Sequence, residues 1–224
     1  MMRFKENNYN KLFVGLSNLI RYICGGDRLK RITNIIDELL KKKYLEKNRK
    51  LKILDFGCGS MEISKKLKDK IYVGQIVGSD IFKHRYESNR IVYVDNDELF
   101  KKKEKFDIIF IVDVLHHIGV DDAYKMIKKL SKLSNNIIIK DHFEHSYLSR
   151  QLLRFVDFYA NYGYGVNIPK KYFDKASWKK TLIKSNCREI FHSKNFQQHD
   201  GLFNFILNKK HHFISVIKTN EKNR

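Results

Sequence analysis

The fold of this chain is decided by one stretch, Lys52-Ile53-Leu54-Asp55-Phe56-Gly57-Cys58-Gly59-Ser60. Its short apolar run ends in a carboxylate and then meets two glycines, which is typical of a buried parallel strand that enters a tight loop before a helix. Glycine has no Cβ and tolerates a positive φ, so backbone N–H groups in such a loop can approach a ligand closely. We therefore expect Gly57, Cys58 and Gly59 to lie against a bound ligand.

Asp55 helps to separate the two classes of ligand that such a loop serves. A dinucleotide pyrophosphate prefers the N–H groups of a helix N-terminus with no anion nearby. The third glycine of the dinucleotide fingerprint is also absent at Ile63 and around it. S-adenosylmethionine carries no phosphate, and its sulfonium and ammonium groups are cationic, so a carboxylate at the strand end suits it. The loop therefore favours a methyl donor, although two glycines alone are a weak signal.

The composition indicates one folded α/β domain. The chain has 224 residues, 42% of them hydrophobic and 13% aromatic, which is enough for a proper core. No stretch approaches the roughly 20 uncharged apolar residues of a membrane span, and the N-terminus lacks a signal-peptide pattern. Three widely separated cysteines, Cys24, Cys58 and Cys187, favour reduced thiols in a cytoplasmic protein. The histidines and cysteines show no zinc-ligand spacing, so we expect no metal.

The net charge of +20 leaves two interpretations open. Such a charge attracts RNA or an anionic membrane surface, so either is a candidate partner. The lysines are, however, spread over many segments and are not gathered into one basic stripe with interleaved aromatic residues. Lysines that simply decorate exposed helix faces explain this distribution equally well.

Two N-terminal helices are expected before the first strand. Apolar residues recur at helical spacing over 9–23, and Gly25-Gly26 then gives a helix C-terminal signal. Asp27 can cap a second helix, whose apolar stripe runs to Leu40 and is followed by a basic end. The first helix could serve as a lid or lie on a membrane, although packing on the sheet is the simpler expectation.

Alternating strands and helices fill the rest of the chain. Early strands are expected at 51–55, 75–80, 91–94, 107–112 and 136–140, with helices at 61–68 and 121–134. The periodicity then changes, and we expect helices at 146–165 and 175–184 and late strands at 188–196 and 211–218. We expect one domain over 1–224, with N-terminal helices at 1–48, a donor-binding half at 49–142, probable acceptor-side insertions at 143–210 and the last strand at 211–218.

Carboxylates recur at or next to the C-terminal ends of the early strands. Ligands bind at this edge of an open parallel sheet, whereas a purely structural distribution would scatter the acids. Asp80 follows Gly59 by 21 residues, the spacing at which an acid reaches ribose hydroxyls. The repetition supports a nucleoside-containing ligand at this edge.

Three segments resemble the class I S-adenosylmethionine-dependent methyltransferases. They are the strand and loop Ile53–Gly59, the run Phe106–His117 with its Asp113-Val114-Leu115-His116-His117, and the end Lys140-Asp141-His142. The chain departs from the family at Met61, where a further glycine is usual. The resemblance implies an α/β fold with a seven-stranded, mostly parallel sheet, helices on both faces and a reversed last strand. The N-terminal helices expected from the apolar spacing are extra to this fold. The same resemblance implies S-adenosylmethionine as cofactor and S-adenosylhomocysteine as its product.

The resemblance also implies which residues would hold the donor. The methionine part would lie against Asp55, Gly57, Cys58, Gly59 and Val112. The ribose hydroxyls would bind Asp80, and the adenine would pack on Ile81 and bind Asp95 beside the Asn96 backbone. An aspartate at a strand end is also often a helix N-cap, which is the alternative for each of these acids.

Histidines at the same edge are the candidate bases. His117 is favoured, with Asp113 orienting it, and His116 then packs or caps; the reverse order is the alternative. Asp141 and His142 could do the same work from the next strand. Lys140 could bind an anionic acceptor, and Tyr162 and Tyr164 could stack on one.

The expected activity is methylation of an oxygen or nitrogen atom of a small molecule or biosynthetic intermediate. An RNA methyltransferase is the first alternative, but enzymes that methylate base amino groups usually carry a Pro-Pro element after strand four, and Asp113-Val114-Leu115-His116 has no proline. A donor-binding module without chemistry is the second alternative. The candidate bases favour an enzyme.

Overall fold

The computed structural model describes residues 11–82, 87–161, 165–193, 196–198, 204 and 207–220, and of residues 11–27 it describes the backbone only. Tyr162 and Tyr164 therefore lie outside the described residues, as does the side chain of Cys24. Within the described part of the chain, no helix has the length and apolar character needed to cross a membrane.

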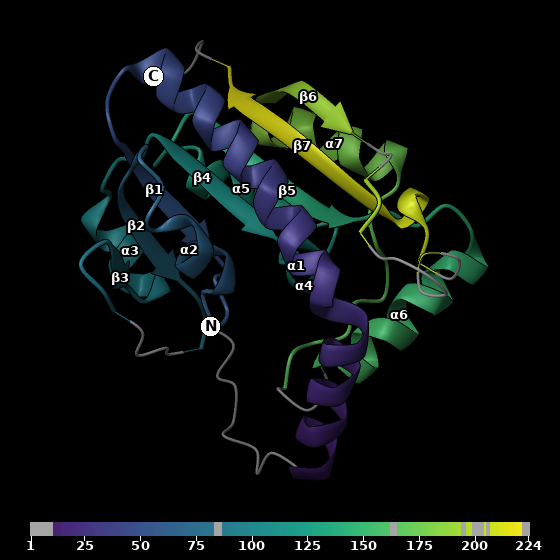
Figure 1. The fold of residues 1–224 in the computed structure, drawn as a ribbon. Helices are drawn as coiled ribbons and strands as arrows, with labels where there is room; N and C mark the ends of the chain where they lie inside the picture. The colour runs from purple at the N-terminus through teal and green to yellow at the C-terminus, as the bar shows by residue number, and fades with distance from the viewer. Residues whose placement is uncertain are drawn as a thin grey trace.

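A seven-stranded sheet forms the centre of the molecule, in the order β3-β2-β1-β4-β5-β7-β6 (Figure 1). Its first five strands are parallel, and β7 runs antiparallel to both β5 and β6. This confirms the predicted sheet with its reversed last strand. The strands are β1 (Leu51–Phe56), β2 (Val73–Ser79), β3 (Ile91–Tyr93), β4 (Ile108–Val112), β5 (Asn136–His142), β6 (Cys187–Ser193) and β7 (His212–Thr219).

Among the residues that the structure describes, seven α-helices and a short 3-10 helix have bounds that can be given. They are α1 (Lys11–Lys47), α2 (Glu62–Leu67), α3 (Asn96–Lys102), α4 (Leu115–Ile118), α5 (Ala123–Leu130), α6 (Tyr147–Asn161), α7 (Lys175–Ser185) and η2 (Lys209–His211). The structure describes the helix predicted at 146–165 from Tyr147 to Asn161, and the strand predicted at 188–196 from Cys187 to Ser193. The short helices α3 and α4 were not predicted, because each has too few residues for a helical period to show.

The central strands are apolar along their whole length because helices cover both faces of the sheet. On one face Ile53 and Phe110 pack with residues of α1 such as Ile36. On the other face Leu54 and Ile109 pack with residues of α5 and α7. Figure 1 shows the same arrangement, with α1 running across one side of the sheet and α5 and α7 on the opposite side.

The N-terminal region is one helix, so the prediction of two helices divided at Gly25-Gly26 is wrong. The backbone of α1 is helical from Lys11 to Lys47 through both glycines. A glycine inside a helix costs about 1 kcal/mol relative to alanine but does not block helical geometry. Burial of Ile32, Ile36 and Leu40 against the sheet offsets this cost. The continuous helix also reaches α6, which it contacts.

Candidate active site

Gly57 and Gly59 form a tight loop at the C-terminal end of β1, with φ of 74° and 49°. The N–H of Gly57 donates to the carbonyl of Ser79 at 2.7 Å, which ties the loop to β2. A Cβ at Gly57 would lie 2.2 Å from a methyl carbon of Val114. Only glycine therefore fits at position 57, both by backbone conformation and by space.

Met61 stands where the resembling family usually has a further glycine. Its φ is 59°, so it adopts the left-handed conformation that a glycine would provide. The side chain is fully buried, and a Cβ at Gly78 would lie 2.4 Å from its terminal methyl carbon. The loop thus keeps its curvature, because the packing of Met61 over Gly78 offsets about 1–2 kcal/mol of backbone strain.

Two of the strand-end acids hold this loop in place. Oδ2 of Asp55 accepts a hydrogen bond from the Ser64 hydroxyl at 2.6 Å, and burial raises the pKa of Asp55 to about 7. Asp80 accepts from the backbone N–H of Gly59 at 2.8 Å and from that of Phe82 at 3.0 Å. Each carboxylate oxygen has a second lone pair for a ligand.

Other residues predicted to contact the adenine have contacts within the protein. Asp95 is the N-cap of α3, and its Oδ1 accepts from the N–H of Glu98 at 2.8 Å. Oδ1 of Asn96 accepts from the hydroxyl of Ser79 at 2.7 Å, and Ile81 is exposed. The N-cap alternative therefore applies to Asp95, whose second oxygen stays a predicted acceptor for the adenine amine.

A cavity of about 470 Å³ extends from the glycine loop to α6. Arg28 and Leu29 of α1 and Leu153, Val156 and Asp157 of α6 close it. The predicted site residues that line it are Asp55, Gly57, Cys58, Gly59, Val112, Asp113, His116, His117 and His142. Asp80, Ile81, Asp95, Asn96 and Asp141 are not among the described residues that line it.

His116 is buried between two carboxylates. Its Nδ1 lies 2.5 Å from Oδ1 of Asp141, and its Nε2 lies 3.4 Å from Oδ2 of Asp157. Burial opposes the charged form, but Asp141 and Asp157 together raise the pKa of His116 to about 10. Without another cation in the cavity, His116 therefore carries its proton at neutral pH and cannot accept one.

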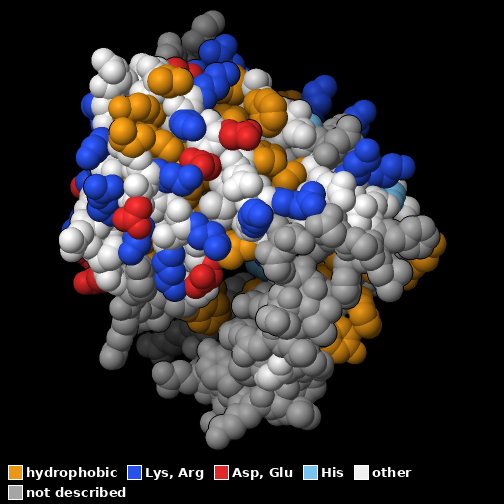
Figure 2. Space-filling model, in the orientation of Figure 1, with side chains coloured by type: hydrophobic (Ala, Val, Ile, Leu, Met, Phe, Trp, Pro, Cys, Tyr) orange, Lys and Arg blue, Asp and Glu red, His pale blue; other side chains and the backbone are white. Residues whose placement is uncertain are grey.

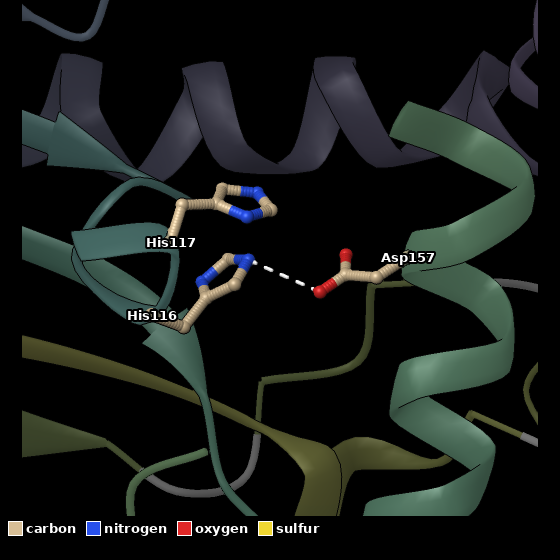
Figure 3. A group of neighbouring side chains, drawn as sticks. All are labelled: His116, His117 and Asp157. Atoms are coloured by element: carbon tan, nitrogen blue, oxygen red, sulfur yellow. Dashed lines mark ion pairs between the residues drawn. The ribbon is translucent and has the colours of Figure 1, made fainter. Parts of the chain in front are cut away.

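His117 also lines the cavity, and its Nε2 carries a lone pair. Its Nδ1 lies 2.9 Å from the backbone carbonyl of Asn167, which can only accept, so Nδ1 carries the hydrogen. Burial and the neighbouring His116 lower the pKa of His117. Figure 3 shows both histidines of α4 directed toward Asp157 of α6.

Asp113 does not orient His117, so that prediction is wrong. Its carboxylate accepts from Arg28 and, at 2.5 Å, from Lys140, and it lies 3.3 Å from Nε2 of His142. No hydrogen bond joins Asp113 to His117 in the described structure. The φ of 55° at Asp113 turns its side chain toward β5 and α1, away from α4. Lys140 is buried in this pair, which removes it as a contact for an anionic acceptor.

Asp157 and Tyr172 complete the site and were not predicted. The Tyr172 hydroxyl donates to Oδ2 of Asp157 at 2.5 Å, and Asp157 is buried within the apolar face of α6. One sequence signal was present, because an aspartate beside Leu153 and Val156 interrupts an apolar stripe. Its partners cannot be read from the sequence, since they come from α4 and from the segment after α6.

A family model described as a methyltransferase domain matches residues 25–206. The chain belongs to the class I S-adenosylmethionine-dependent methyltransferases. Its methyl donor is S-adenosylmethionine. The site fits this donor by charge, because the Asp55 carboxylate and the open backbone at Gly59 line the cavity where a cationic methionine moiety would lie.

Solved structures support the fold of this methyltransferase. The magnesium protoporphyrin IX methyltransferase ChlM from Synechocystis PCC 6803 with bound SAH is 17% identical, covers 95% of this chain and 96% of that one, and has a TM-score of 0.59. An S-adenosylmethionine-dependent methyltransferase from Clostridium acetobutylicum is 16% identical, with coverage of 96% and 100% and a TM-score of 0.57. A Haloferax volcanii protein in complex with the Trm112 methyltransferase activator is 9% identical, with coverage of 77% and 84% and a TM-score of 0.58. No curated protein sequence matches significantly.

Replacing Asp80 in this methyltransferase should weaken the binding of S-adenosylmethionine by roughly 10–150-fold, since a charge-assisted hydrogen bond contributes about 1.5–3 kcal/mol. The measurement is calorimetric titration of Asp80→Ala with the donor, and Asp97→Ala is the control because Asp97 is an exposed acid in the first turn of α3. Unchanged donor affinity in Asp80→Ala would remove Asp80 from the donor site.

Proposed function

We propose that this methyltransferase acts on an oxygen or nitrogen atom of a small molecule bound in the cavity between the glycine loop and α6. One observation carries the proposal. The same cavity is lined by Asp55 and Gly57–Ser60 at the donor end and by His116, His117 and Asp157 at the other end. Its volume of about 470 Å³ lies in the range typical of small-molecule sites.

The chain holds the donor through residues at the C-terminal ends of β1, β2, β3 and β4 and in the loops that follow the first three of them. Asp55 and the backbone of Gly57–Gly59, with Val112, would contact the methionine part, and Asp80 would accept from the ribose hydroxyls. Ile81, Asp95 and the Asn96 backbone would contact the adenine. The bound donor supplies an activated methyl group, so the protein's contribution is alignment of the acceptor and exclusion of water.

The acceptor atom would lie beside Nε2 of His117. A hydroxyl or protonated amine must lose a proton during methylation, and the lone pair on Nε2 serves this need in either of two ways. It can take the proton directly, or it can hold a cation that lowers the acceptor's pKa. Asp141 and Asp157 fix His116, and Asp141 also accepts from the N–H of Leu115 at 3.0 Å, which holds α4 in position.

The two alternatives receive less support. Figure 2 shows lysine and arginine side chains dispersed among acidic and hydrophobic ones on this face, without the basic stripe that an RNA strand requires. The walls of α1 and α6 also suit a small molecule better than a polynucleotide. A donor-binding module without chemistry would not need an oriented histidine at the acceptor end of the cavity.

Incubation with methyl-labelled S-adenosylmethionine and fractionated cell extract tests the proposal. We expect label in a small molecule with the native chain and none with His117→Ala. Label found in RNA would favour the nucleic-acid alternative. No transfer to any fraction despite donor binding would favour the module without chemistry.

Donor affinity should fall as the pH drops below 7. Burial raises the pKa of Asp55 to about 7, with Asp80 adding to the rise and Ser64 opposing it. The cationic donor binds the ionised carboxylate, so below this pKa binding must displace a proton, and affinity at pH 6 should be about tenfold weaker than at pH 8. Burial also keeps the nearby thiol of Cys58 protonated throughout this range. Calorimetry across pH 6–8 measures the slope, and a slope that persists in Asp55→Asn would assign the titration to another group.

A further inference from the structure

We propose that His116, His117 and Asp157 bind a divalent transition-metal ion, with the donor set of a zinc site, at the acceptor end of the cavity. One ligand atom from each residue lies within 4.8 Å of the others. Nε2 of His116 and Oδ2 of Asp157 are 3.4 Å apart. Two ligands of a tetrahedral zinc ion, each bound at about 2.0–2.1 Å, lie about 3.4 Å from each other. This pair therefore already has the separation that an ion requires.

Nε2 of His116 independently points to a ligand. The atom is buried, its 3.4 Å ion pair with Oδ2 of Asp157 is longer than a normal hydrogen bond, and no hydrogen bond reaches it within the described structure. Buried polar atoms in native proteins nearly always have a partner. An ion between this nitrogen and Asp157 would provide one.

The opposite side of each proposed histidine ligand is already held by a second residue. Nδ1 of His116 lies against the Asp141 carboxylate, and Nδ1 of His117 lies against the Asn167 carbonyl. A histidine that binds a metal through one ring nitrogen usually donates its other N–H to such an oxygen. The Tyr172 hydroxyl fixes the third ligand differently, because it donates to Oδ2 of Asp157, the oxygen that faces His116. Both histidines are thus oriented so that Nε2 is the atom left for a metal.

The donor set selects the kind of ion. Two imidazoles and one carboxylate suit zinc, iron and related transition metals, whereas magnesium and calcium take oxygen ligands. Three protein ligands leave a further coordination position. All three residues line the cavity, so this position faces the space that the acceptor would occupy.

The inference deepens the proposed function and rests on it only for the role of the ion. An acceptor hydroxyl or amine in the open position would have its pKa lowered by the metal and would release its proton to solvent water. The lone pair of His117 would then hold the ion and would not take the proton directly. The metal would also replace the proton on Nε2 of His116, since metal ligands bind in their deprotonated form.

Metal binding can be measured without any methyl transfer. The full chain is freed of metal with a chelator and then titrated with Co²⁺. Calorimetry and the visible absorption of the bound ion monitor the titration. We expect one ion per chain. His117→Ala and Asp157→Asn should each weaken Co²⁺ binding by more than about 100-fold. Tyr172→Phe removes only the hydroxyl that donates to Asp157, so it should weaken Co²⁺ binding by about 10–100-fold.

Controls separate loss of the site from loss of the fold. His145→Ala is the matched control, because His145 is exposed and its ring packs beside His211, away from the proposed ligands. Calorimetry with S-adenosylmethionine shows whether each variant is folded, and His117→Ala alone decides the result if Asp157→Asn fails to fold. Absence of stoichiometric binding by the native chain, or equal weakening in His145→Ala and His117→Ala, would overturn the metal site.

The two proposals fail in different ways. Donor binding and label transfer by a chain that binds no metal would overturn the metal site and leave the proposed function standing. Metal binding by a chain that methylates no small molecule would overturn the proposed function and leave the metal site standing.

Discussion

His117→Ala should lower kcat by about 10²–10⁴ and leave the affinity for S-adenosylmethionine nearly unchanged. The substitution removes the Nε2 lone pair at the acceptor end of the cavity, whereas the donor end is formed by Asp55 and the glycine loop. The expected loss of rate is the same whether this lone pair takes the acceptor's proton or binds a metal ion, because the substitution removes it in both cases. Steady-state rates with the acceptor found by the label screen, together with calorimetry of the donor, measure both quantities.

His145→Ala serves as the control for His117→Ala, because it removes an exposed imidazole. Its kcat should equal that of the native chain. Full activity of His117→Ala would make His117 structural, and methyl transfer would then proceed by alignment of donor and acceptor alone.

Gly57→Ala should destabilise the protein by roughly 2–5 kcal/mol and abolish donor binding. A left-handed conformation costs a residue with a Cβ about 1–2 kcal/mol, and overpacking adds about 1–3 kcal/mol. Both apply here, since φ is 74° and the new Cβ would lie 2.2 Å from a Val114 methyl carbon. This loss is a large part of the roughly 5–15 kcal/mol that stabilises a typical domain. Denaturant unfolding measures the difference.

Two further variants separate backbone strain from steric overlap. Gly59 has a similar positive φ, but a Cβ at this position would have no neighbour within 4 Å. Gly59→Ala should therefore lower the free energy of unfolding by only about 1–2 kcal/mol. Gly57→Ala combined with Val114→Ala removes the overlapping methyl carbons and should recover part of the stability. Equal losses in Gly57→Ala and Gly59→Ala would show that the overlap with Val114 contributes nothing.

The sequence alone determined the sheet and the donor loop. Buried parallel strands are continuous apolar runs, and glycines mark the turn after β1, so neighbours along the chain carry the whole signal. Asp55 and Asp80 were predicted as donor contacts for the same reason, because the ends of parallel strands meet at one edge of the sheet. The resemblance to the methyltransferases rested on these same local patterns.

The tertiary structure decided the course of α1 and the partners of Asp113. Gly25-Gly26 reads locally as a helix end, but burial of the apolar stripe of α1 against the sheet favours a continuous helix. Asp113 precedes His117 closely in sequence, yet the positive φ at Asp113 directs it to Arg28 and Lys140. Local spacing cannot reveal such contacts, because they join segments far apart in the chain.

The acceptor end of the cavity also came from the tertiary structure. His116 and His117 lie on α4, Asp157 lies on α6 and Tyr172 lies beyond it, so no ligand spacing appears in the sequence. The expectation of no metal rested on that spacing. Packing of α6 over the carboxyl edge of the sheet brings these residues together, because the apolar face of α6 is buried there and carries Asp157 with it. Local sequence pattern thus set the proposed donor half of the site, and long-range packing set the proposed acceptor half.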